Sequence, residues 1–174
     1  MNILGIDPGF ASGGAARLVN GKFELIESLP STHLTEIDDR VDSAVAWFCS
    51  HIRYSNLVCV ENQHGAAYGQ HSRANSGASV AWVREVVGGI RRACYEQQIP
   101  VRLIEPQEWR TRLGLPRTAK KKQAWLSVCG WHPELSGIRT NEHSRDAAVI
   151  AHVGGIAANL WLMTWREGRM GFIR

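Results

Sequence analysis

The chain has 174 residues, of which 44% are hydrophobic and 21% are charged, and its formal net charge at pH 7 is +4. These totals are typical of a globular protein with one domain over residues 1–174, and they exclude a disordered or low-complexity chain. We expect no signal peptide, because no charged region with an apolar run and a cleavage site begins the sequence.

The apolar stretch from Ala147 to Trp165 has the length of a membrane span. His152 and the pair Gly154-Gly155 interrupt it, and much of the remainder is alanine. Such a composition favours a buried helix over a membrane helix, so we expect no contact with a membrane.

Four cysteines are scattered along the chain, without a CxxC pair or the spacing of metal ligands: Cys49, Cys59, Cys94 and Cys129. Reduced thiols on apolar faces are the simplest interpretation. Since reduced cysteines are typical of the cytoplasm, we expect an intracellular, cytoplasmic protein.

Three consecutive strands are predicted at the start of the chain. The run Asn2–Asp7 is apolar up to its final carboxylate, as in a short buried strand. Two further runs, 12–19 and 22–29, are joined by Asn20-Gly21, and this pair predicts a tight hairpin because both turn positions need a positive φ. The three strands are therefore expected to be antiparallel.

Strands and helices alternate in the remainder of the chain. In chain order, the patterns predict a helix over 37–52 capped by Thr35 or Asp38, a strand over 57–61, a loop over 64–79, a helix over 80–94, a strand over 101–104, a short helix around Trp109, a helix through Trp125 and Val128, and a final helix over 142–165. Three antiparallel strands followed by two strands reached through helices predict an α/β fold with a mixed five-stranded sheet.

The helix predicted at 80–94 has an apolar stripe that consists of Val80, Val83, Val87, Ile90 and Cys94. Trp82 and Arg84 lie off this stripe, which would suit a second buried contact. A dimer face and a single exposed tryptophan on the helix of a monomer are the two interpretations.

Two carboxylates, Asp7 and Glu61, end apolar strand runs and are expected at the rim of the sheet. In the predicted order the first and fourth strands can lie side by side, which would bring the two carboxylates together. Two like charges at short distance repel, and a divalent cation between them is the usual way to keep both ionised. For either acid alone, a turn or a helix cap is the ordinary alternative.

The segment His143-Ser144-Arg145-Asp146 lies at the start of the final predicted helix. Positions three apart share a helix face, so His143 and Asp146 point in the same direction. The small residues after Asp146 suggest that the helix approaches the sheet closely and brings the acid to the same rim. A first-turn acid favoured by the helix dipole and a capping or surface histidine are the alternatives.

Most of the basic excess lies after residue 60 and peaks between residues 102 and 122. A polyanion is the natural partner of such a patch, because neutralised phosphates release condensed counterions. A solvated helical face is the alternative. We expect phosphate contacts from Arg110, Arg112, Arg117, Lys120, Lys121 and Lys122.

Five motifs together resemble the RuvC family of Holliday-junction resolvases, and their order and spacing match over nearly the whole chain. They are Leu4-Gly5-Ile6-Asp7-Pro8-Gly9, Glu61 after an apolar strand, Pro106-x-x-Trp109, Ala119-x-Lys121-x-Gln123, and His143-x-x-Asp146-Ala147-Ala148. The resemblance implies a ribonuclease H-like fold with helices on both faces of the sheet, a homodimer, and a catalytic, metal-ligating set of Asp7, Glu61, His143 and Asp146. Many relatives carry an acid at the position of His143, and histidine is a known family variant.

The same resemblance implies two Mg²⁺ ions per site, with Mn²⁺ as a substitute, and hydrolysis that leaves a 5′-phosphate and a 3′-hydroxyl. His143 is expected to ligate a metal or to move a proton. The loop over 64–79 is expected to meet the branch point of the DNA, where relatives place an aromatic wedge. Its candidate contacts are His64, Tyr68 and Arg73.

The function that the sequence favours is a metal-dependent endonuclease that resolves four-way DNA junctions by paired nicks. A nuclease of the same fold that acts on flaps, forks or other branched DNA is the main alternative. Kinases and ATPases with a similar first strand need a second lobe, for which this chain is too short. An inert DNA-binding module is at odds with four filled ligand positions.

Overall fold

The computed structural model describes residues 1–62 and 77–166, with side chains placed for residues 1–62 and 80–159. In chain order the elements are β1 (Asn2–Asp7), β2 (Gly14–Val19), β3 (Lys22–Ser28), α1 (Ile37–Ile52), β4 (Leu57–Glu61), α2 (Gly77–Glu96), β5 (Val101–Ile104), α3 (Pro106–Arg112), α4 (Lys121–Trp131), the short 3₁₀ turn η1 (Pro133–Leu135) and α5 (Glu142–Arg166). All the predicted strands and helices are present. No helix within these described ranges is long and apolar enough to cross a membrane.

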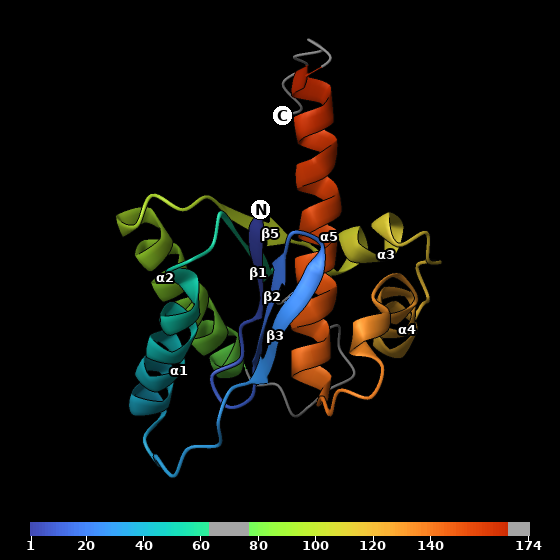
Figure 1. Ribbon diagram of the computed structural model, residues 1–174. Helices are drawn as coiled ribbons and strands as arrows, with labels where there is room; N and C mark the ends of the chain where they lie inside the picture. The colour runs from blue at the N-terminus through green and yellow to red at the C-terminus, as the bar shows by residue number, and fades with distance from the viewer. Residues whose placement is uncertain (63–76, 167–174) are drawn as a thin grey trace.

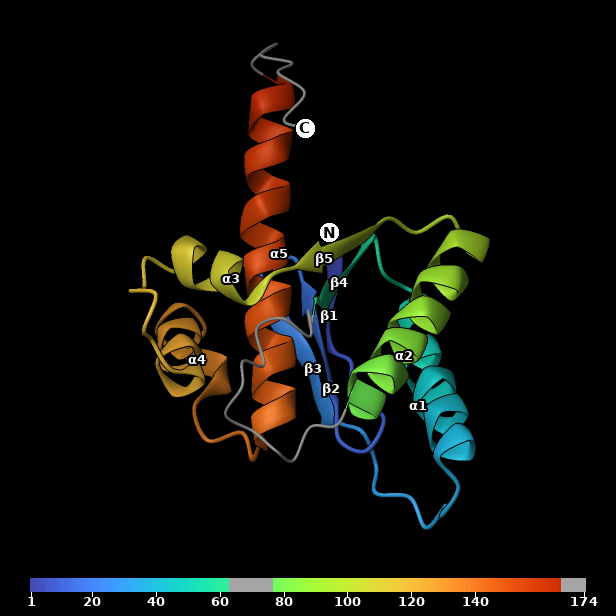
Figure 2. The same cartoon turned by 180° about the vertical axis from the view of Figure 1, so that it is seen from behind.

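The five strands form the predicted mixed sheet, in the order β3-β2-β1-β4-β5. Strand β1 is central, because it pairs antiparallel with β2 and parallel with β4. Asn20 and Gly21 have φ values of 49° and 85°, so the predicted hairpin turn between β2 and β3 is confirmed. Helices α1 and α2 cover one face of the sheet, and α3, α4 and α5 lie on the other, as Figures 1 and 2 show.

Helix α1 begins without either of the predicted caps. Its N-cap residue is Glu36, which makes no side-chain capping hydrogen bond, so the assignment of Thr35 or Asp38 is wrong. Asp38 and Asp39 lie in the first turn, where a negative charge interacts favourably with the helix dipole. Asp38 and Asp39 therefore stabilise the start of α1 through their charge and not through a capping hydrogen bond.

Helix α2 packs on α1 through a stripe that shares Ile90 and Cys94 with the predicted one and adds Val86. Its fully buried side chains are Val86, Ile90 and Cys94, each four residues apart. Trp82, one turn before Val86, is partly buried and packs against the same core, as the predicted stripe residue Val87 does. The prediction that Trp82 lies off the buried stripe is therefore wrong.

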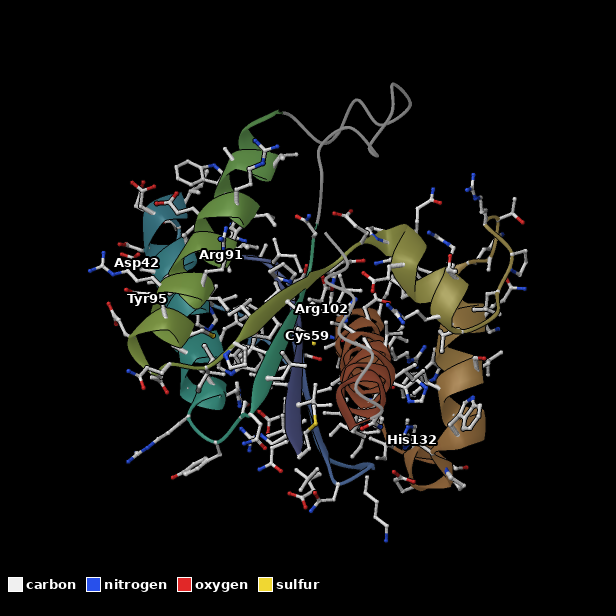
Figure 3. All side chains as sticks on the ribbon, turned by 90° about the horizontal axis from the view of Figure 1, so that it is seen from above. Asp42, Cys59, Arg91, Tyr95, Arg102 and His132 are labelled. Carbon is white, nitrogen blue, oxygen red and sulfur yellow. The ribbon has the colours of Figure 1, made fainter. Side chains whose placement is uncertain are left out.

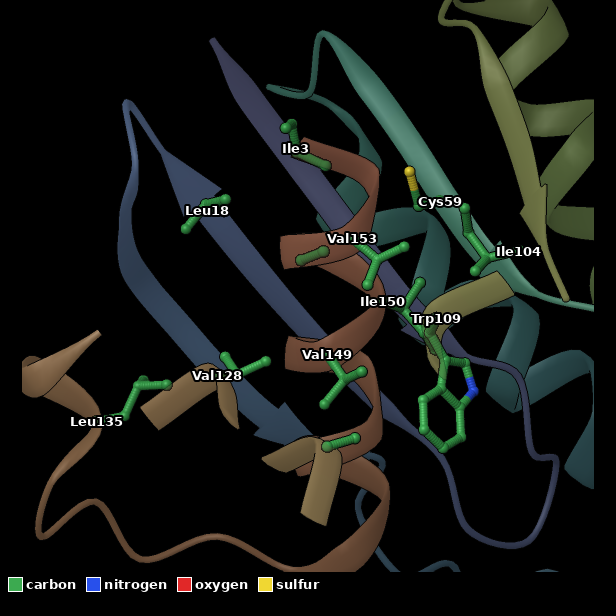
Figure 4. Packing of buried hydrophobic residues seen from close by; sticks show 12 residues of the cluster. Ile3, Leu18, Cys59, Ile104, Trp109, Val128, Leu135, Val149, Ile150 and Val153 are labelled. Carbon is green, nitrogen blue, oxygen red and sulfur yellow. The ribbon is translucent and has the colours of Figure 1, made fainter. Parts of the chain in front are cut away.

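Two hydrophobic clusters lie on opposite faces of the sheet, because alternate strand side chains point in opposite directions. Leu4 and Ile6 of β1 pack against α1 and α2. Ile3 of β1 and Cys59 of β4 point to the other face and join a cluster with Trp109 of α3 and with residues of α4 and α5, shown in Figure 4. The odd-numbered positions of β1 and β4 therefore face α5.

Two glycines let α5 pack closely on the centre of the sheet. A Cβ atom on Gly5 would lie 2.2 Å from the carbonyl oxygen of Ala147 and 2.4 Å from the backbone nitrogen of Ala151. A Cβ atom on Gly14 would lie 2.3 Å from the carbonyl oxygen of His143. No side chain larger than hydrogen fits at these strand positions, so the first turns of α5 rest directly on the backbones of β1 and β2.

The variant Gly5→Ala should lose about 3 kcal/mol or more of its free energy of unfolding, because its methyl group meets helix backbone that cannot move aside. Urea unfolding measures this loss. Gly130→Ala is the matched control, since a Cβ atom at position 130 in α4 meets nothing within 4 Å, and alanine favours a helix by about 1 kcal/mol over glycine. Equal unfolding midpoints for the two variants would contradict the proposed tight contact.

A buried histidine pair joins the end of α4 to α5. His132 and His152 are 6% and 8% exposed, and Nε2 of His132 lies 2.8 Å from Nδ1 of His152. The other ring nitrogen of His132 lies 3.3 Å from Oε1 of Glu134. Donation from His132 Nδ1–H to Glu134 leaves Nε2 of a neutral His132 as the acceptor for His152 Nδ1–H.

The remaining nitrogen of His152, Nε2, is buried and has no hydrogen-bond partner among the described residues. A proton added to this nitrogen would be buried without an acceptor. Burial, together with the nearby His132, lowers the pKa of His152 from 6.5 to about 4. His152 is therefore neutral in the core at neutral pH.

Because the folded pKa of His152 is depressed, the unfolded chain binds more protons than the folded chain between about pH 6.5 and 4. The stability that depends on neutral His152 is fully present above pH 6.5 and is lost as the pH falls towards 4, by about 2 to 3 kcal/mol. The free energy of unfolding of His152→Gln should fall less steeply over this range than that of the wild type. The exposed His33→Gln serves as control, and parallel curves for the wild type and His152→Gln would refute the assignment.

Candidate functional site

Two buried carboxylates lie side by side where β1 and β4 end. Asp7 is 2% exposed and Glu61 is 5% exposed. The parallel register pairs Ile6 with Val60, so the next residues in each strand, Asp7 and Glu61, are neighbours at the same edge of the sheet. The predicted adjacency of the two strands is confirmed. Since odd-numbered positions of these strands face α5, both carboxylates are on the α5 side.

The first turn of α5 brings two more polar side chains to this edge. Asn141, just before the helix, accepts a hydrogen bond at Oδ1 from the backbone N–H of Ser144 at 2.9 Å, which caps the helix start. One turn on, His143 and Asp146 share a helix face. His143 Nδ1–H donates to Asp7 Oδ2 at 2.8 Å, and Asp146 is 8% exposed. The structure therefore brings the helix pair together with the strand carboxylates, as predicted.

Lys121, at the first position of α4, is the fifth member of this cluster. Its Nζ atom forms an ion pair with Oδ2 of Asp146. Sequence reasoning grouped Lys121 with the phosphate-binding lysines and missed this contact. The motif Ala119-x-Lys121-x-Gln123 contained the signal, since it stands apart from a plain run of basic residues.

The charges in the cluster shift one another's pKa values. Burial lowers the pKa of Lys121, but the carboxylates of Glu61, Asp146 and Asp7 outweigh burial and raise the pKa above its usual value. The hydrogen bond to Asp7 raises the pKa of His143. Burial raises the pKa of Asp146, although Lys121 counteracts it. The site is an acidic cluster that holds a bound cationic side chain.

The donor chemistry of this cluster fits a hard divalent cation. Three buried carboxylates and one imidazole supply oxygen and nitrogen ligands of the kind that Mg²⁺ and Mn²⁺ accept. Among the residues that the structure describes, no three His, Cys, Asp or Glu side chains are grouped closely enough to hold one ion in their present positions. Asp146 is turned to Lys121, and Asp7 to His143. In these positions two of the three carboxylates, Asp146 and Asp7, are each bound by a side chain of the protein itself.

A layer of side chains around the cluster fixes its walls. Asn62, next to Glu61, donates from Nδ2 to Oε1 of Glu105 at 2.6 Å, which ties the end of β4 to the start of α3. The buried Trp109 lies beside α5, as Figure 4 shows. A small pocket of about 10 Å³, enough for about one water molecule, is lined by Glu61, Trp109, Lys121, Ala124, Asp146, Val149 and Ile150.

Apart from Lys121, the predicted phosphate-binding residues fall into three groups. Arg110 has an internal role: it donates to the carbonyl oxygens of Ala119 and Pro106, both at 2.9 Å, and its guanidinium lies 4.2 Å from the centre of the Trp109 ring. Arg110 therefore joins α3 to the segment before α4, and its contact with a DNA phosphate stays a prediction.

The second group is paired and the third is exposed. Arg112 donates from Nε to Glu108 at 3.0 Å, and the same carboxylate binds Arg102. The exposed members are Arg117, Lys120 and Lys122. A groove of about 630 Å³ between α3 and α5 is lined by Gln107, Glu108, Thr111, Arg112, Arg117 and Ile156. Predicted DNA contacts that lie outside the residues with described side chains are His64, Tyr68 and Arg73.

Comparison with known proteins finds the fold but no close relative. No protein-family model and no curated protein matches the chain. The chain is similar to the structure of Thermus thermophilus RuvC, with 22% identity and a TM-score of 0.75 over 92% of this chain and 97% of that chain. It is also similar to T. thermophilus RuvC in complex with Holliday junction substrate, with 22% identity and a TM-score of 0.74 over 92% of this chain and 96% of that chain.

A third similar structure is the yeast mitochondrial Holliday junction resolvase, with 12% identity and a TM-score of 0.60 over 98% of this chain and 84% of that chain. The chain therefore has the ribonuclease H-like fold of RuvC, as predicted. These similarities concern the fold, whereas the chemistry depends on the side chains of the site.

Arg110→Met should lower the free energy of unfolding by about 2 kcal/mol, because the carbonyl oxygens of Ala119 and Pro106 lose their hydrogen-bond donor and the Trp109 ring loses its guanidinium contact. Arg117→Met should leave the unfolding free energy unchanged and weaken binding of a fluorescent four-way DNA junction, with the salt slope of the affinity reduced by about one. Urea unfolding and fluorescence anisotropy at several salt concentrations separate the two roles. The reverse assignment would follow if Arg117→Met lost stability and Arg110→Met did not.

Proposed function

We propose that this chain is a RuvC-type resolvase, an endodeoxyribonuclease that cuts four-way DNA junctions by paired hydrolytic nicks and so acts in DNA recombination and repair. One observation carries the proposal. Asp7, Glu61, His143 and Asp146 come from three separate elements and meet at one edge of a sheet with the RuvC fold. Structural cores rarely gather buried carboxylates in this way, because each buried charge costs free energy unless it is compensated.

The same four residues would hold divalent cations, Mg²⁺ or Mn²⁺, and the resemblance to the RuvC family implies two ions per site. When bound, such ions supply an activated water and charge stabilisation at a phosphodiester, and the products carry 5′-phosphate and 3′-hydroxyl ends. One of the similar structures is a RuvC in complex with Holliday junction substrate, which supports branched DNA as the partner of this chain. At position 143 this chain has a histidine, where many members of the family that it resembles have an acid.

The chain's own groups have distinct tasks in this proposal. His143 is half-buried, with 35% of its side chain exposed, so its other ring nitrogen can meet solvent or substrate and move a proton while Asp7 orients the ring. Lys120 and Lys122 flank Lys121 at the start of α4 and are exposed, where they can contact phosphates beside the cut. Such contacts position DNA and carry little sequence information.

Paired nicks need two sites, so the proposal includes a homodimer. Helix α2 supplies a candidate face on the side away from the sheet, formed by its exposed residues Ala81, Arg84, Gly88, Arg91 and Tyr95. Figure 3 shows Arg91 and Tyr95 on this outer side. Tyr95 is 83% exposed, which is high for an aromatic side chain. Trp82 is partly buried against the core, so Tyr95 is the more exposed of these two aromatic residues of α2.

A broader structure-selective nuclease is the second candidate. The carboxylate cluster and the exposed basic residues serve cleavage of any branched DNA equally well, because phosphate contacts do not distinguish a junction from a flap. Selectivity between these substrates depends on the groups that meet the branch point. A flap substrate therefore belongs beside the junction in a test of the function.

The test is cleavage of a labelled synthetic four-way junction, a flap and a linear duplex in Mg²⁺, Mn²⁺ or EDTA. The wild type should cut the junction with paired nicks in either metal and not in EDTA. Asp7→Asn should lower the cutting rate by a factor of about 10³ or more while junction binding persists, since it removes one buried ligand.

The exposed Asp42→Asn of α1 is the matched control and should cut as the wild type does. Equal cutting of the flap and the junction would favour the broader nuclease. Junction binding without any cutting by the wild type would contradict the proposed enzyme.

A further inference from the structure

The ammonium group of Lys121 lies among the carboxylates that the proposed function assigns to metal ligation. Its Nζ atom is paired with Asp146, whose side chain is 10% exposed. Glu61 and Asp7 act on the same ammonium at longer range. The groups around this ion pair include Trp109, Ala124 and Val149, which line the adjoining pocket and leave little room for water.

This ion pair differs from an ordinary surface pair. Arg92 and Glu96, an ion pair on α2, are 81% and 60% exposed at their side chains, and such pairs contribute little to stability. Lys121 is 43% exposed at its side chain, and its partner Asp146 is almost fully buried. An electrostatic interaction in this less polar setting is stronger than one in water.

The local structure directs Lys121, and not its neighbours, into the cluster. The backbone N–H of Lys120 donates to Oε1 of Gln123 at 2.8 Å, which fixes the start of α4. Ala119, just before it, is buried against the protein body. Lys121 is exposed like Lys120 and Lys122 on either side of it, but its ammonium is paired with Asp146. The position of Lys121 is therefore set by the fold and is not one choice among three equivalent lysines.

One cationic side chain and one divalent cation have the same electrostatic task at this site. Asp146 Oδ2 is bound by Lys121, so a metal ion that uses this oxygen must compete with the ammonium. The two cations also repel each other if both remain near Asp146. Occupation of the cluster by the side chain thus opposes occupation by the ion.

We propose that Lys121 is a built-in competitor of the divalent cation: it pairs with Asp146 and offsets part of the negative charge of the carboxylate cluster when no metal is bound, and metal binding displaces it from Asp146. The inference rests on the proposed function, since it takes the cluster as a metal site. The displaced ammonium remains at the edge of the cluster, where a DNA phosphate provides an alternative partner. Metal binding and DNA binding are then coupled through one lysine, because a phosphate that holds Lys121 leaves Asp146 open to the ion.

The test is Mn²⁺ binding to the DNA-free protein, measured by the electron paramagnetic resonance signal of free Mn²⁺. Lys121→Met keeps the length of the side chain and removes the charge, and it should bind Mn²⁺ at least about tenfold more tightly than the wild type. Lys121→Arg keeps the positive charge and should stay close to the wild-type affinity. Lys22→Met, exposed in β3 at the opposite end of that strand from the cluster, controls for the change in net charge and should also match the wild type.

The outcomes separate this inference from the proposed function. Lys121→Met with the wild-type affinity for Mn²⁺, or a weaker one, would overturn the competition while leaving the metal site intact. Absence of Mn²⁺ binding in both the wild type and Lys121→Met would overturn the metal site and the competition together. Circular dichroism establishes that each variant is folded, and Lys121→Gln, with the same expected tightening, replaces Lys121→Met if the latter does not fold.

Discussion

Helix α5 approaches β1 so closely that position 5 has room only for a glycine. Backbone contacts of this kind set the height of the helix over the sheet, because neither backbone can be compressed. The same contact sets where the first turn of α5 lies relative to the strand ends. His143 then reaches Asp7, and Asp146 comes to the same edge. The site therefore depends on a packing constraint that is located one turn away from it.

The cluster that results is costly for the fold. Its carboxylates are 2 to 8% exposed, and like charges in such a place repel one another. The structure offsets this cost with an ammonium from α4 and an imidazole from α5, which bind Asp146 and Asp7 respectively. A site built for folding alone would use apolar side chains at these positions, which are as stable or more stable. The charged cluster therefore supports the proposed catalytic role over a purely structural one.

Much of the architecture could be predicted from local patterns. The hairpin at Asn20-Gly21 follows from the need for positive φ, and the adjacency of Asp7 and Glu61 follows from the order of the strands. The joint position of His143 and Asp146 follows from helix periodicity. These features depend on spacing along the chain, which a sequence displays directly.

Other features depend on the direction of single side chains and could not be predicted. Arg110 lies in the basic segment that suggested phosphate contacts, yet its guanidinium donates to two carbonyl oxygens and packs on Trp109. Lys121 is one of three consecutive lysines, and although its motif sets it apart from the other two, its pairing with Asp146 is visible only in the fold. The buried face of α2 is wider than the predicted stripe, because Trp82 and Val86 pack against the same core as Val87 and Ile90. In each case a tertiary contact decides between local choices of similar energy.

The most direct test of the metal site is a crystal structure of the protein with Mn²⁺, in which anomalous scattering locates the ion. We expect an anomalous peak among Asp7, Glu61, His143 and Asp146, with the Lys121 ammonium moved off Asp146. A peak elsewhere, or none at saturating Mn²⁺, would contradict the claim that this edge of the sheet is a metal-dependent active site.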